Sequence, residues 1–591
     1  MAEENYEFSW ENPQYRKTYW HTCSHILAQA VKRLYPEVKL AIGPSIDNGF
    51  YYDMDSPFAF TPEIMDKIEE EMRKICKEKL PLVRFVLPRP EAVKYMEEKG
   101  EPYKVELIND LPEDEEISFY TQGEFTDLCA GPHVDSTGRI KANAIKLTAC
   151  NAAYWRGDSS RQTLQRIYGV AFPKKEQLDE YLVKLEEAKA RDHRKLGKEL
   201  GLFMVDELVG KGMPMFLPKG YTVWRILENY IRDKEIRQGY QHVLTPCVGT
   251  VNLYKTSGHW DHYQQNMFPP MEVEDEVYVL RPMNCPHHMR IFANSQHSYR
   301  NMPVRIGEIA HDFRFEASGS LKGIERGRHF CQNDAHLFVT PEQIKEEFSK
   351  VVDMIFETYK DFNITNYRCV LSLRDPADKK KYHDDDQMWN TAENALREVL
   401  NELGLDYTEE IGEAAFYGPK LDVNVVPAVG AEYTLSTCQL DFCLPARFNL
   451  TYVDNEGVER TPVVLHRAIL GSLDRFMAYL IEETKGAFPA WLAPVQVKLL
   501  PVTDRANGYC EEYAAELERK GFRVEVDDRN EKIGKKIREG QLEKVPYMVI
   551  VGDRDIENGT VSPRDRVQGD LGAMSGDAFI GLLSQVVEEK R

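Results

Sequence analysis

The sequence predicts a protein of the α+β class with several domains, the largest of them built on an antiparallel sheet. The chain has 591 residues, which is too long for one hydrophobic core and favours three or four domains. Residues 305–338 form two runs of alternating chemistry around a Gly/Ser-rich turn, a pattern typical of a long antiparallel hairpin. Past Pro489 the patterns of strand and helix alternate, as they do in βαβ units.

The hairpin carries side chains that suit a nucleotide better than an ordinary core. Strand periodicity predicts that Arg314 and Glu316 share one face of the first run. The second run places a polar or aromatic residue at every other position, namely Arg326, Arg328, Phe330, Gln332, Asp334 and His336. Arginines bind phosphates through paired hydrogen bonds, and a phenyl ring offers a stacking surface for a base. A salt-bridged outer face is the alternative, but it leaves the ring, the amide and the imidazole unexplained.

The bulk composition restricts the class of protein. The net charge of −21 argues against a membrane surface as partner, although a local basic face can still bind RNA. No apolar run approaches ~18 residues, and the acidic start MAEENYEF does not resemble a signal peptide. The eleven scattered cysteines do not resemble a disulfide framework. We therefore expect a cytoplasmic protein without a membrane partner.

The motifs RFEASG, GRHF and QNDAHLF resemble motif 2 and its sequel in the class II aminoacyl-tRNA synthetases, specifically the threonyl-tRNA synthetases. The resemblance covers nearly everything from His21 to the end of the chain. It implies an antiparallel-sheet catalytic core with an N-terminal α+β editing domain and a C-terminal α/β anticodon-binding domain. The implied divisions are a polar lead at 1–20, the editing domain at 21–171, a connecting helix at 172–201, the core at 202–489 and the anticodon-binding domain at 490–591. Bacterial members usually begin with a further ubiquitin-like domain, which we expect this chain to lack.

The resemblance also implies an activity. Members of this family activate L-threonine with ATP to threonyl-adenylate, transfer it to the 3′ end of tRNA(Thr), and hydrolyse mischarged seryl-tRNA(Thr). Two rival functions stay open at this point. One is an RNA-binding regulator derived from a synthetase, and the other is a hydrolase that edits tRNA but no longer charges it.

Near the N-terminus, four histidines and cysteines have the chemistry of a metal site. His21 and His25 are four residues apart in an amphipathic segment, so they share one helix face. Cys129 and His133 flank a Gly-Pro pair, which places them on a loop or strand end. By residue chemistry alone these four predict zinc. The resemblance instead implies a metal-free editing site, to which the family pattern adds Tyr52, Lys104 and Asp127. Metal stoichiometry separates the readings, since one zinc per chain fits editing and two fit the alternative.

Further along the chain, two segments prepare the catalytic core. Residues 172–201 are rich in charge and predict a solvated connecting helix. A long amphipathic helix and an extended segment ending at Pro246 resemble motif 1, which implies a homodimer. His259 matches a family histidine placed near the terminal ribose of the tRNA, where it would accept a proton during aminoacyl transfer.

Three residues match the zinc triad of the family's active site, namely Cys285, His336 and His466. Three protein ligands leave coordination positions open, which is typical of a zinc ion that binds substrate. Such an ion, one per subunit, can separate threonine from valine by the hydroxyl group, whereas an apolar pocket gains only about a hundredfold. Serine keeps the hydroxyl and passes this selection, so an editing domain is the expected complement.

The remaining core residues match positions for ATP and threonine. No Walker A or G-x-G-x-x-G pattern occurs. Instead the resemblance assigns Arg314 to the α-phosphate, Glu316 to the adenine amino group and Arg326 to the γ-phosphate, with Mg²⁺ as counter-ion. Phe330 and Arg475 would enclose the base. The matched threonine-binding positions are Gln332, Asp334, Tyr417, Lys420, Thr437 and Gln439.

The chain departs from the family pattern at a few positions. Tyr433, Thr434 and Leu435 stand where the family usually has Trp-Gln-Cys, which puts one contact to ATP in doubt. In the C-terminal domain the positions that match anticodon readers are Asn530, Arg538, Asp555 and Arg564. Asp555 is usually a glutamate, and Asp565 replaces an uncharged threonine.

Overall fold

The computed structural model describes residues 9–158, 160–428 and 430–591 of the chain. The chain forms two compact units, Met1–Glu186 and Glu187–Arg591. Both combine helices with antiparallel sheets, which confirms the predicted α+β class. Among the described residues, no helix combines the length and the apolar character that a membrane span requires.

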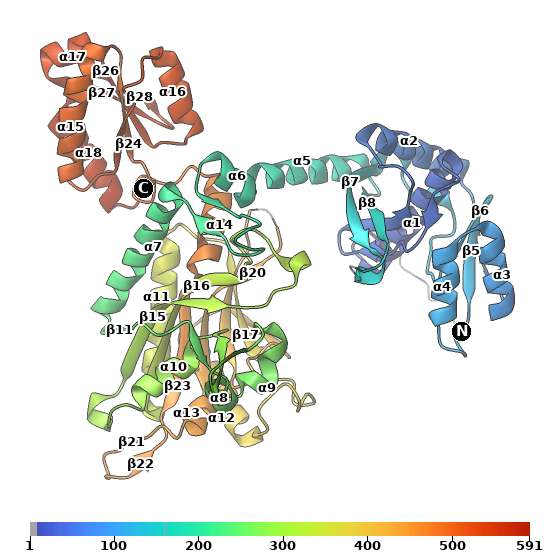
Figure 1. Cartoon of the computed structure of the whole chain (residues 1–591), viewed down its shortest axis with the longest axis horizontal. Coiled ribbons are helices and arrows are strands. Elements are labelled where there is room, and N and C mark those ends of the chain that lie inside the picture. The colour runs from blue at the N-terminus through green and yellow to red at the C-terminus, as the bar shows by residue number, and fades with distance from the viewer. Residues whose placement is uncertain (1–8, 159, 429) are drawn as a thin grey trace. The chain divides into compact units, whose positions relative to one another are not determined.

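Helix α1 (Pro13–Leu34) lies at the centre of the first unit (Figure 1). The Asn12 side chain accepts a hydrogen bond from the Gln14 N–H at 2.9 Å, and Pro13 fits the first turn. Every residue from Thr22 to Val31 is buried, so the helix is enclosed on all sides. Residues 13–20 are thus helical, whereas the sequence analysis placed them in a polar lead. The first part of that lead, residues 1–8, lies outside the described residues.

A five-stranded sheet packs against α1, together with helix α2 (Pro62–Glu78). Its strands are β1 (Lys39–Leu40), β2 (Ser45–Ile46), β3 (Gly49–Asp55), β7 (Ile145–Tyr154) and β8 (Thr163–Ala171). A second sheet of the same unit consists of β4 (Leu82–Val86), β5 (Ser118–Gln122) and β6 (Phe125–Leu128), accompanied by helices α3 (Arg89–Lys99) and α4 (Pro102–Asp110). Strand β6 ends at Leu128, so Cys129 follows a strand end as predicted.

The second unit begins within the predicted connecting segment. Helix α5 (Lys175–Arg191) crosses the division between the units, and helix α6 (His193–Glu199) follows it. The break lies at Asp192, whose carboxylate accepts a hydrogen bond from the Arg194 N–H at 2.8 Å and so caps the new helix. The segment is helical, as predicted, but in two pieces.

An eight-stranded sheet organises the second unit. Its order is β11-β15-β16-β23-β20-β19-β17-β18, antiparallel except at the two edge pairs. The strands are β11 (Gln241–His242), β15 (Val304–Phe313), β16 (His329–Val339), β17 (Tyr367–Leu373), β18 (Tyr407–Ile411), β19 (Lys420–Val425), β20 (Tyr433–Asp441) and β23 (Val463–Ser472). The predicted long hairpin is the β15–β16 pair.

The two faces of this sheet have different partners. One face contributes Leu337, Leu421 and Leu465 to a hydrophobic core. The helices that complete this core are α7 (Pro218–Arg237), α11 (Ile344–Asp361), α12 (Asp386–Glu402) and α14 (Leu473–Thr484). Because strand side chains alternate, His336 and His466 point away from this helical layer. The opposite face is therefore free to form a site.

The hairpin corrects one prediction about strand faces. Strand β15 ends at Phe313 and β16 begins at His329, so Arg314, Glu316 and Arg326 lie in the connection. The period-two argument does not apply to them, since the backbone between the strands includes turns and a short helix at Ser318–Ser320. It does hold from Phe330 onward, within β16.

A buried ion pair joins the helical layer to the sheet. Arg467 of β23 is 1% exposed and places Nη2 2.7 Å from Oε1 of Glu235, a residue of α7 that is fully buried. The Glu235 carboxylate also accepts a hydrogen bond from Asn333 Nδ2 at 2.8 Å and contacts His242 Nε2 at 2.6 Å.

Replacing Glu235 by glutamine should lower the free energy of unfolding by about 3 kcal/mol, because it leaves the guanidinium of Arg467 buried without a negative partner. Urea unfolding measures the loss. The control is Glu357→Gln, which removes an exposed pair with Lys234 (3.4 Å, with the Glu357 side chain 64% exposed). That change should cost less than about 0.5 kcal/mol. If both variants lost the same free energy of unfolding, burial of the unpaired Arg467 charge would not be the cause of the loss.

The C-terminal part of the second unit has the predicted alternation of strands and helices. Its sheet has the order β25-β24-β26-β27-β28, with β29 on β27. The strands are β24 (Val497–Pro501), β25 (Val524–Val526), β26 (Tyr547–Val551), β27 (Thr560–Asp565), β28 (Gly569–Asp570) and β29 (Met574–Ser575). The helices are α15 (Asn507–Arg519), α16 (Ile533–Leu542), α17 (Asp553–Asn558) and α18 (Gly576–Glu588).

Candidate active site and histidine–cysteine clusters

A cavity of about 830 Å³ opens on the face of the eight-stranded sheet that the helical layer leaves free. Nine of the residues singled out in the sequence line it: Cys285, Arg314, Gln332, Asp334, Tyr417, Lys420, Thr437, Gln439 and His466. They come from β16, β19, β20, β23, the loops beside them, and helix α10 (Cys285–Phe292). Residues far apart in the sequence thus meet in one cavity.

Cys285, His336 and His466 form the first histidine–cysteine cluster. One donor atom from each lies within 4.8 Å of the other two. The antiparallel register of β16 and β23 pairs His336 directly with His466, and Cys285 begins α10. All three are buried, with 5% exposure for Cys285, 0% for His336 and 4% for His466.

The hydrogen bonds of this cluster fit a metal ion. His336 Nδ1 contacts His288 Nδ1 at 2.8 Å, and His466 Nε2 contacts Asp441 Oδ2 at 2.8 Å. The other ring nitrogens, His336 Nε2 and His466 Nδ1, are buried and have no hydrogen-bond partner among the described residues, although Asp334 Oδ2 lies 3.7 Å from His336 Nε2. Two unpartnered imidazole nitrogens and a thiol are a donor set that zinc prefers, and outer partners of this kind fix the orientation of ligating histidines. The residues therefore fit a zinc ion.

Hydrogen bonds, ring stacking and an ion pair connect several of the predicted threonine-binding residues with their neighbours. Tyr417 Oη donates to Gln439 Oε1 at 2.7 Å, and its ring stacks on His466 with the centroids 5.0 Å apart. Asp422 accepts a hydrogen bond from Thr437 Oγ1 at 2.9 Å and pairs with Lys420.

Asp334 is also buried in this group, and burial raises the pKa of its carboxyl group to about 6. A polar cavity with a perturbed carboxylate beside a candidate metal site is typical of an active site.

The three arginines predicted to contact ATP lie near one another. The Arg314 guanidinium lies 5.0 Å from the Phe330 ring centroid, and Arg475 Nε donates to the carbonyl of Glu325 at 3.2 Å. Burial lowers the pKa of Arg475, and the charges of Arg314 and Arg326 lower it further. Mutual repulsion among these cations favours binding of an anion.

Glu316 and Arg326 are paired with each other rather than free. Arg326 Nε lies 3.2 Å from Glu316 Oε2. Binding of adenine and γ-phosphate in the predicted way requires this ion pair to open. Glu316, Arg326, Phe330 and Arg475 do not line the cavity itself.

His259 lies deeper than the sequence suggested. It is the first residue of α9 (His259–Tyr263) and is fully buried. Its Nδ1 contacts Ser257 Oγ at 2.8 Å, and its ring packs against Phe416, which lines the cavity. Burial lowers the pKa of the imidazole to about 3, so the ring is neutral at pH 7 and has a lone pair to accept a proton.

The departures at positions 433 and 434 are accommodated locally. The Tyr433 ring centroid lies 5.9 Å from the Arg475 guanidinium, so an aromatic side chain still borders that arginine. Thr434 Oγ1 donates to Asn424 Oδ1 at 2.8 Å. The Thr434 hydroxyl therefore forms its hydrogen bond with the neighbouring strand of the sheet.

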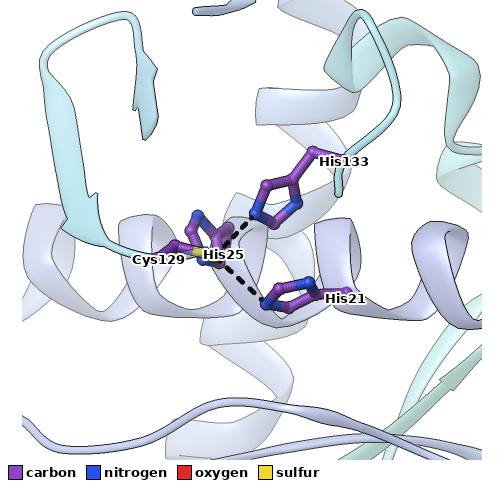
Figure 2. Close-up of side chains that lie close together, drawn as sticks. All are labelled: His21, His25, Cys129 and His133. Carbon is purple, nitrogen blue, oxygen red and sulfur yellow. Dashed lines mark hydrogen bonds between the residues drawn. The ribbon is translucent and has the colours of Figure 1, made fainter. Parts of the chain in front are cut away.

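The second cluster, in the first unit, consists of His21, His25, Cys129 and His133, and Figure 2 shows their side chains directed toward one another. Cys129 Sγ lies 3.4 Å from His21 Nε2 and 3.2 Å from His133 Nε2. Burial raises the pKa of the Cys129 thiol to about 12, so the sulfur is protonated at neutral pH. Burial also lowers the pKa of all three imidazoles, so they are neutral.

The other predicted editing residues adjoin this cluster. Asp127 accepts a hydrogen bond from Tyr52 Oη at 2.5 Å and pairs with Lys104 Nζ at 2.7 Å. Its carboxylate lies 3.9 Å from His25 Nε2. Lys104 and Asp127 are almost fully buried. All seven predicted editing positions are therefore brought together.

The four predicted anticodon positions lie on the C-terminal domain. Asn530 precedes α16, Arg538 lies on α16, and both are exposed, whereas Arg564 lies on β27 and is half-buried. Asp555 uses both carboxylate oxygens locally, since it accepts hydrogen bonds from the Gly552 N–H and from the hydroxyls of Thr560 and Ser562. This carboxylate holds the start of α17.

A third cluster was missed in the sequence. His311, His329 and Cys331 each place a donor atom within 4.8 Å of the others. The predicted site residues occupy even positions of β16, whereas His329 and Cys331 occupy odd ones. The H-x-C spacing of His329 and Cys331 was visible in the sequence, but His311 joins them only through the register of β15 and β16.

Comparisons with known proteins match three family models along the chain. Residues 269–484 match the family model "tRNA synthetase class II core domain (G, H, P, S and T)", and residues 496–585 match "Anticodon binding domain". Residues 117–168 match "Threonyl and Alanyl tRNA synthetase second additional domain".

Individual relatives match over almost the whole chain. A threonine–tRNA ligase of Geobacillus sp. (strain WCH70) is 57% identical over 96% of this chain and 88% of its own length. Threonine–tRNA ligase 1 of Bacillus subtilis (strain 168) is 54% identical over 95% and 87%. A solved structure, the RNA-binding domain of threonyl-tRNA synthetase from Cryptosporidium parvum Iowa II, aligns with a TM-score of 0.64 and 38% identity, covering 67% of this chain and 98% of that one. The chain therefore belongs to the threonine–tRNA ligase family, whose class II core it carries.

Proposed function

We propose that the protein activates L-threonine with ATP and esterifies the 3′ end of tRNA(Thr). The observation that carries this proposal is the meeting of Cys285, His466 and Arg314 in one cavity with the threonine-binding positions. In the first step the threonine carboxylate attacks the α-phosphorus of ATP, and pyrophosphate leaves. In the second the terminal ribose hydroxyl attacks the acyl carbon, and AMP leaves.

The chain's own residues supply position and charge. Arg314 would hold the α-phosphate, and Phe330 and Arg475 would enclose the adenine. The neutral His259, near the cavity wall, would accept a proton during transfer to the tRNA. Cys285, His336 and His466 would hold zinc, which when bound offers coordination positions to the amino and hydroxyl groups of threonine. Mg²⁺ would accompany the nucleotide.

The limited discrimination among amino acids at this site explains why a separate editing site is needed. Valine has no hydroxyl, so it leaves the polar groups of the site unpaired and is rejected strongly. Serine lacks only a methyl group, and that loss is worth about 1–3 kcal/mol. We assign residues 21–171 to editing of seryl-tRNA(Thr), 202–489 to catalysis and 490–591 to the anticodon, with Asn530, Arg538, Asp555 and Arg564 as its contacts. We also infer a cytoplasmic homodimer formed through the motif 1 segment.

Amino-acid-dependent exchange of pyrophosphate into ATP tests the central proposal. Threonine should support exchange, serine should support it about 10- to 200-fold less well, and valine should be rejected far more strongly. The measurement is kcat/KM for each amino acid with the full chain. Absence of threonine-dependent exchange would favour the RNA-binding regulator or the editing hydrolase.

For editing, the geometry favours hydrolysis without a thiolate nucleophile. The buried Cys129 thiol stays protonated, whereas His21, His25 and His133 are neutral and able to orient water or accept its proton. Water would attack the seryl carbonyl carbon, the ester bond would break, and the ribose oxygen would take up a proton.

Replacing Cys129 by alanine should slow deacylation of seryl-tRNA(Thr) by about a hundredfold, because the thiol positions two of the imidazoles. Threonylation should persist, and seryl-tRNA should accumulate. Cys150→Ala is the control, since Cys150 is a half-buried thiol of the same unit outside the cluster. An unchanged zinc content supports metal-free editing, whereas loss of one zinc ion identifies the cluster as a metal site.

A further inference from the structure

The third cluster lies on the β15–β16 hairpin, on the face opposite the cavity. Its members, His311, His329 and Cys331, do not line the cavity. The register pairs His311 directly with Cys331 across the two strands. His311 Nδ1 lies 2.9 Å from His329 Nε2 and 3.0 Å from Cys331 Sγ. Three donor atoms from both strands therefore converge on a small volume.

The Cys331 sulfur lies beside both nitrogens of the His311 ring, 3.0 Å from Nδ1 and 3.6 Å from Nε2. His329 Nε2 also lies within hydrogen-bond distance of His311 Nδ1. A thiol is only a weak hydrogen-bonding group, so hydrogen bonds alone give little reason for these three donor atoms to converge. A cation among them gives that reason, because two imidazole nitrogens and a thiolate sulfur are ligands that zinc prefers. Ligand atoms around tetrahedral zinc are separated by roughly 3.3–3.7 Å, so His311 Nδ1 needs to move away from each of its two neighbours by less than about 1 Å.

The surroundings hold two of the ligands in place and leave a path for an ion. The Cys331 N–H donates to Asp474 Oδ2 at 2.6 Å, and the His311 carbonyl accepts a hydrogen bond from Arg281 Nε at 2.7 Å. Cys331 is 3% exposed, whereas His311 and His329 are half-buried. The two imidazole rings are parallel within 4°, with centroids 5.2 Å apart. A metal ion could therefore reach the buried thiol from the solvent by way of the two half-buried imidazoles.

We propose that His311, His329 and Cys331 form a second metal site, specific for a borderline-soft divalent cation such as Zn²⁺. The site is separate from the Cys285 cluster and lies on the other face of the sheet. Three protein ligands leave a fourth position for water. The ion joins β15 to β16 directly behind the connection that carries Arg314, so it stabilises the hairpin on which the phosphate-binding residues depend.

Cobalt spectroscopy of the full chain tests the site without relying on activity. The background is the double variant Cys285→Ser, Cys129→Ser, in which the other two clusters have lost their thiols. Titration with Co²⁺ should still give a sulfur-to-cobalt charge-transfer band and the strong visible absorption of tetrahedral cobalt. Adding Cys331→Ser should remove the charge-transfer band. Adding Cys443→Ser, a buried thiol outside the clusters, should leave it unchanged.

A second variant covers the case in which Cys331→Ser fails to fold. His329→Gln changes a half-buried residue, keeps the thiol, and should weaken Co²⁺ binding in the same background by at least about tenfold. Zinc analysis of the purified unmutated chain should give two ions, and the content should fall by one in Cys331→Ser and by one in Cys285→Ser. It should not fall in Cys129→Ser, which shows that the second ion does not belong to the editing cluster. A background variant without the charge-transfer band, or a band that survives both Cys331→Ser and His329→Gln, overturns the proposal.

Discussion

Replacing Cys285 by alanine should reduce threonine-dependent pyrophosphate exchange by about a thousandfold or more. The change removes the only thiol of the active-site cluster and leaves His336 Nε2 and His466 Nδ1 without their shared ligand partner. Zinc content should fall by one ion per chain. ATP affinity should change little, because the three arginines predicted to contact ATP are not part of the cluster.

Cys443→Ala is the matched control for this variant. Cys443 is a buried thiol of the same hydrophobic cluster as Cys285 and belongs to none of the histidine–cysteine groups. It should keep both zinc and exchange activity. If Cys285→Ala retained full exchange with threonine, the assignment of substrate to this cluster would be wrong.

The second large effect is expected at Arg314. Arg314→Ala should slow formation of threonyl-adenylate by about a thousandfold, since the guanidinium would neutralise charge that develops on the α-phosphate. Zinc content should be unchanged, which separates this variant from Cys285→Ala. Single-turnover formation of the adenylate measures the effect on chemistry directly.

Arg314→Lys distinguishes charge from geometry. Lysine keeps the positive charge but not the planar pair of donors, so it should recover only part of the lost rate. Full recovery would mean that charge alone suffices. Loss of zinc in either variant would show instead that Arg314 supports the structure of the cavity.

The sequence allowed the site residues to be predicted better than their surroundings. Cys285, His336 and His466 were found by their motifs, and the register of β16 and β23 then places the two histidines side by side. Their outer partners His288 and Asp441 were not found, because those contacts arise only when α10 and the end of β20 pack against the cluster. Residues such as His288 and Asp441, which only orient the candidate ligands, are not singled out by the sequence motifs that identified those ligands.

Errors occurred where local chemistry overrides periodicity. Alternation along the hairpin failed at Arg314 and Arg326, since both lie in the connection rather than in a strand. The start of α1 was placed too late, although Asn12 and Pro13 are a recognisable capping pair. The local hydrogen bonds of Asp555 to the start of α17 and to Thr560 could not be predicted, since its match to an anticodon position says nothing about them.

The pairing of β16 with β23 has a consequence for how this enzyme can change. His466 and Arg467 are neighbours on opposite faces of one strand, the first among the candidate zinc ligands and the second beside Glu235 in the helical layer. A slip of β23 by one residue in one direction would bring Arg467 to the position of His466 and Ala468 to the position beside Glu235. A slip in the other direction would bring Leu465 among the candidate zinc ligands and His466 beside the carboxylate. The candidate zinc site and the contact of β23 with α7 thus depend on one strand register, so a change of that register would disrupt both.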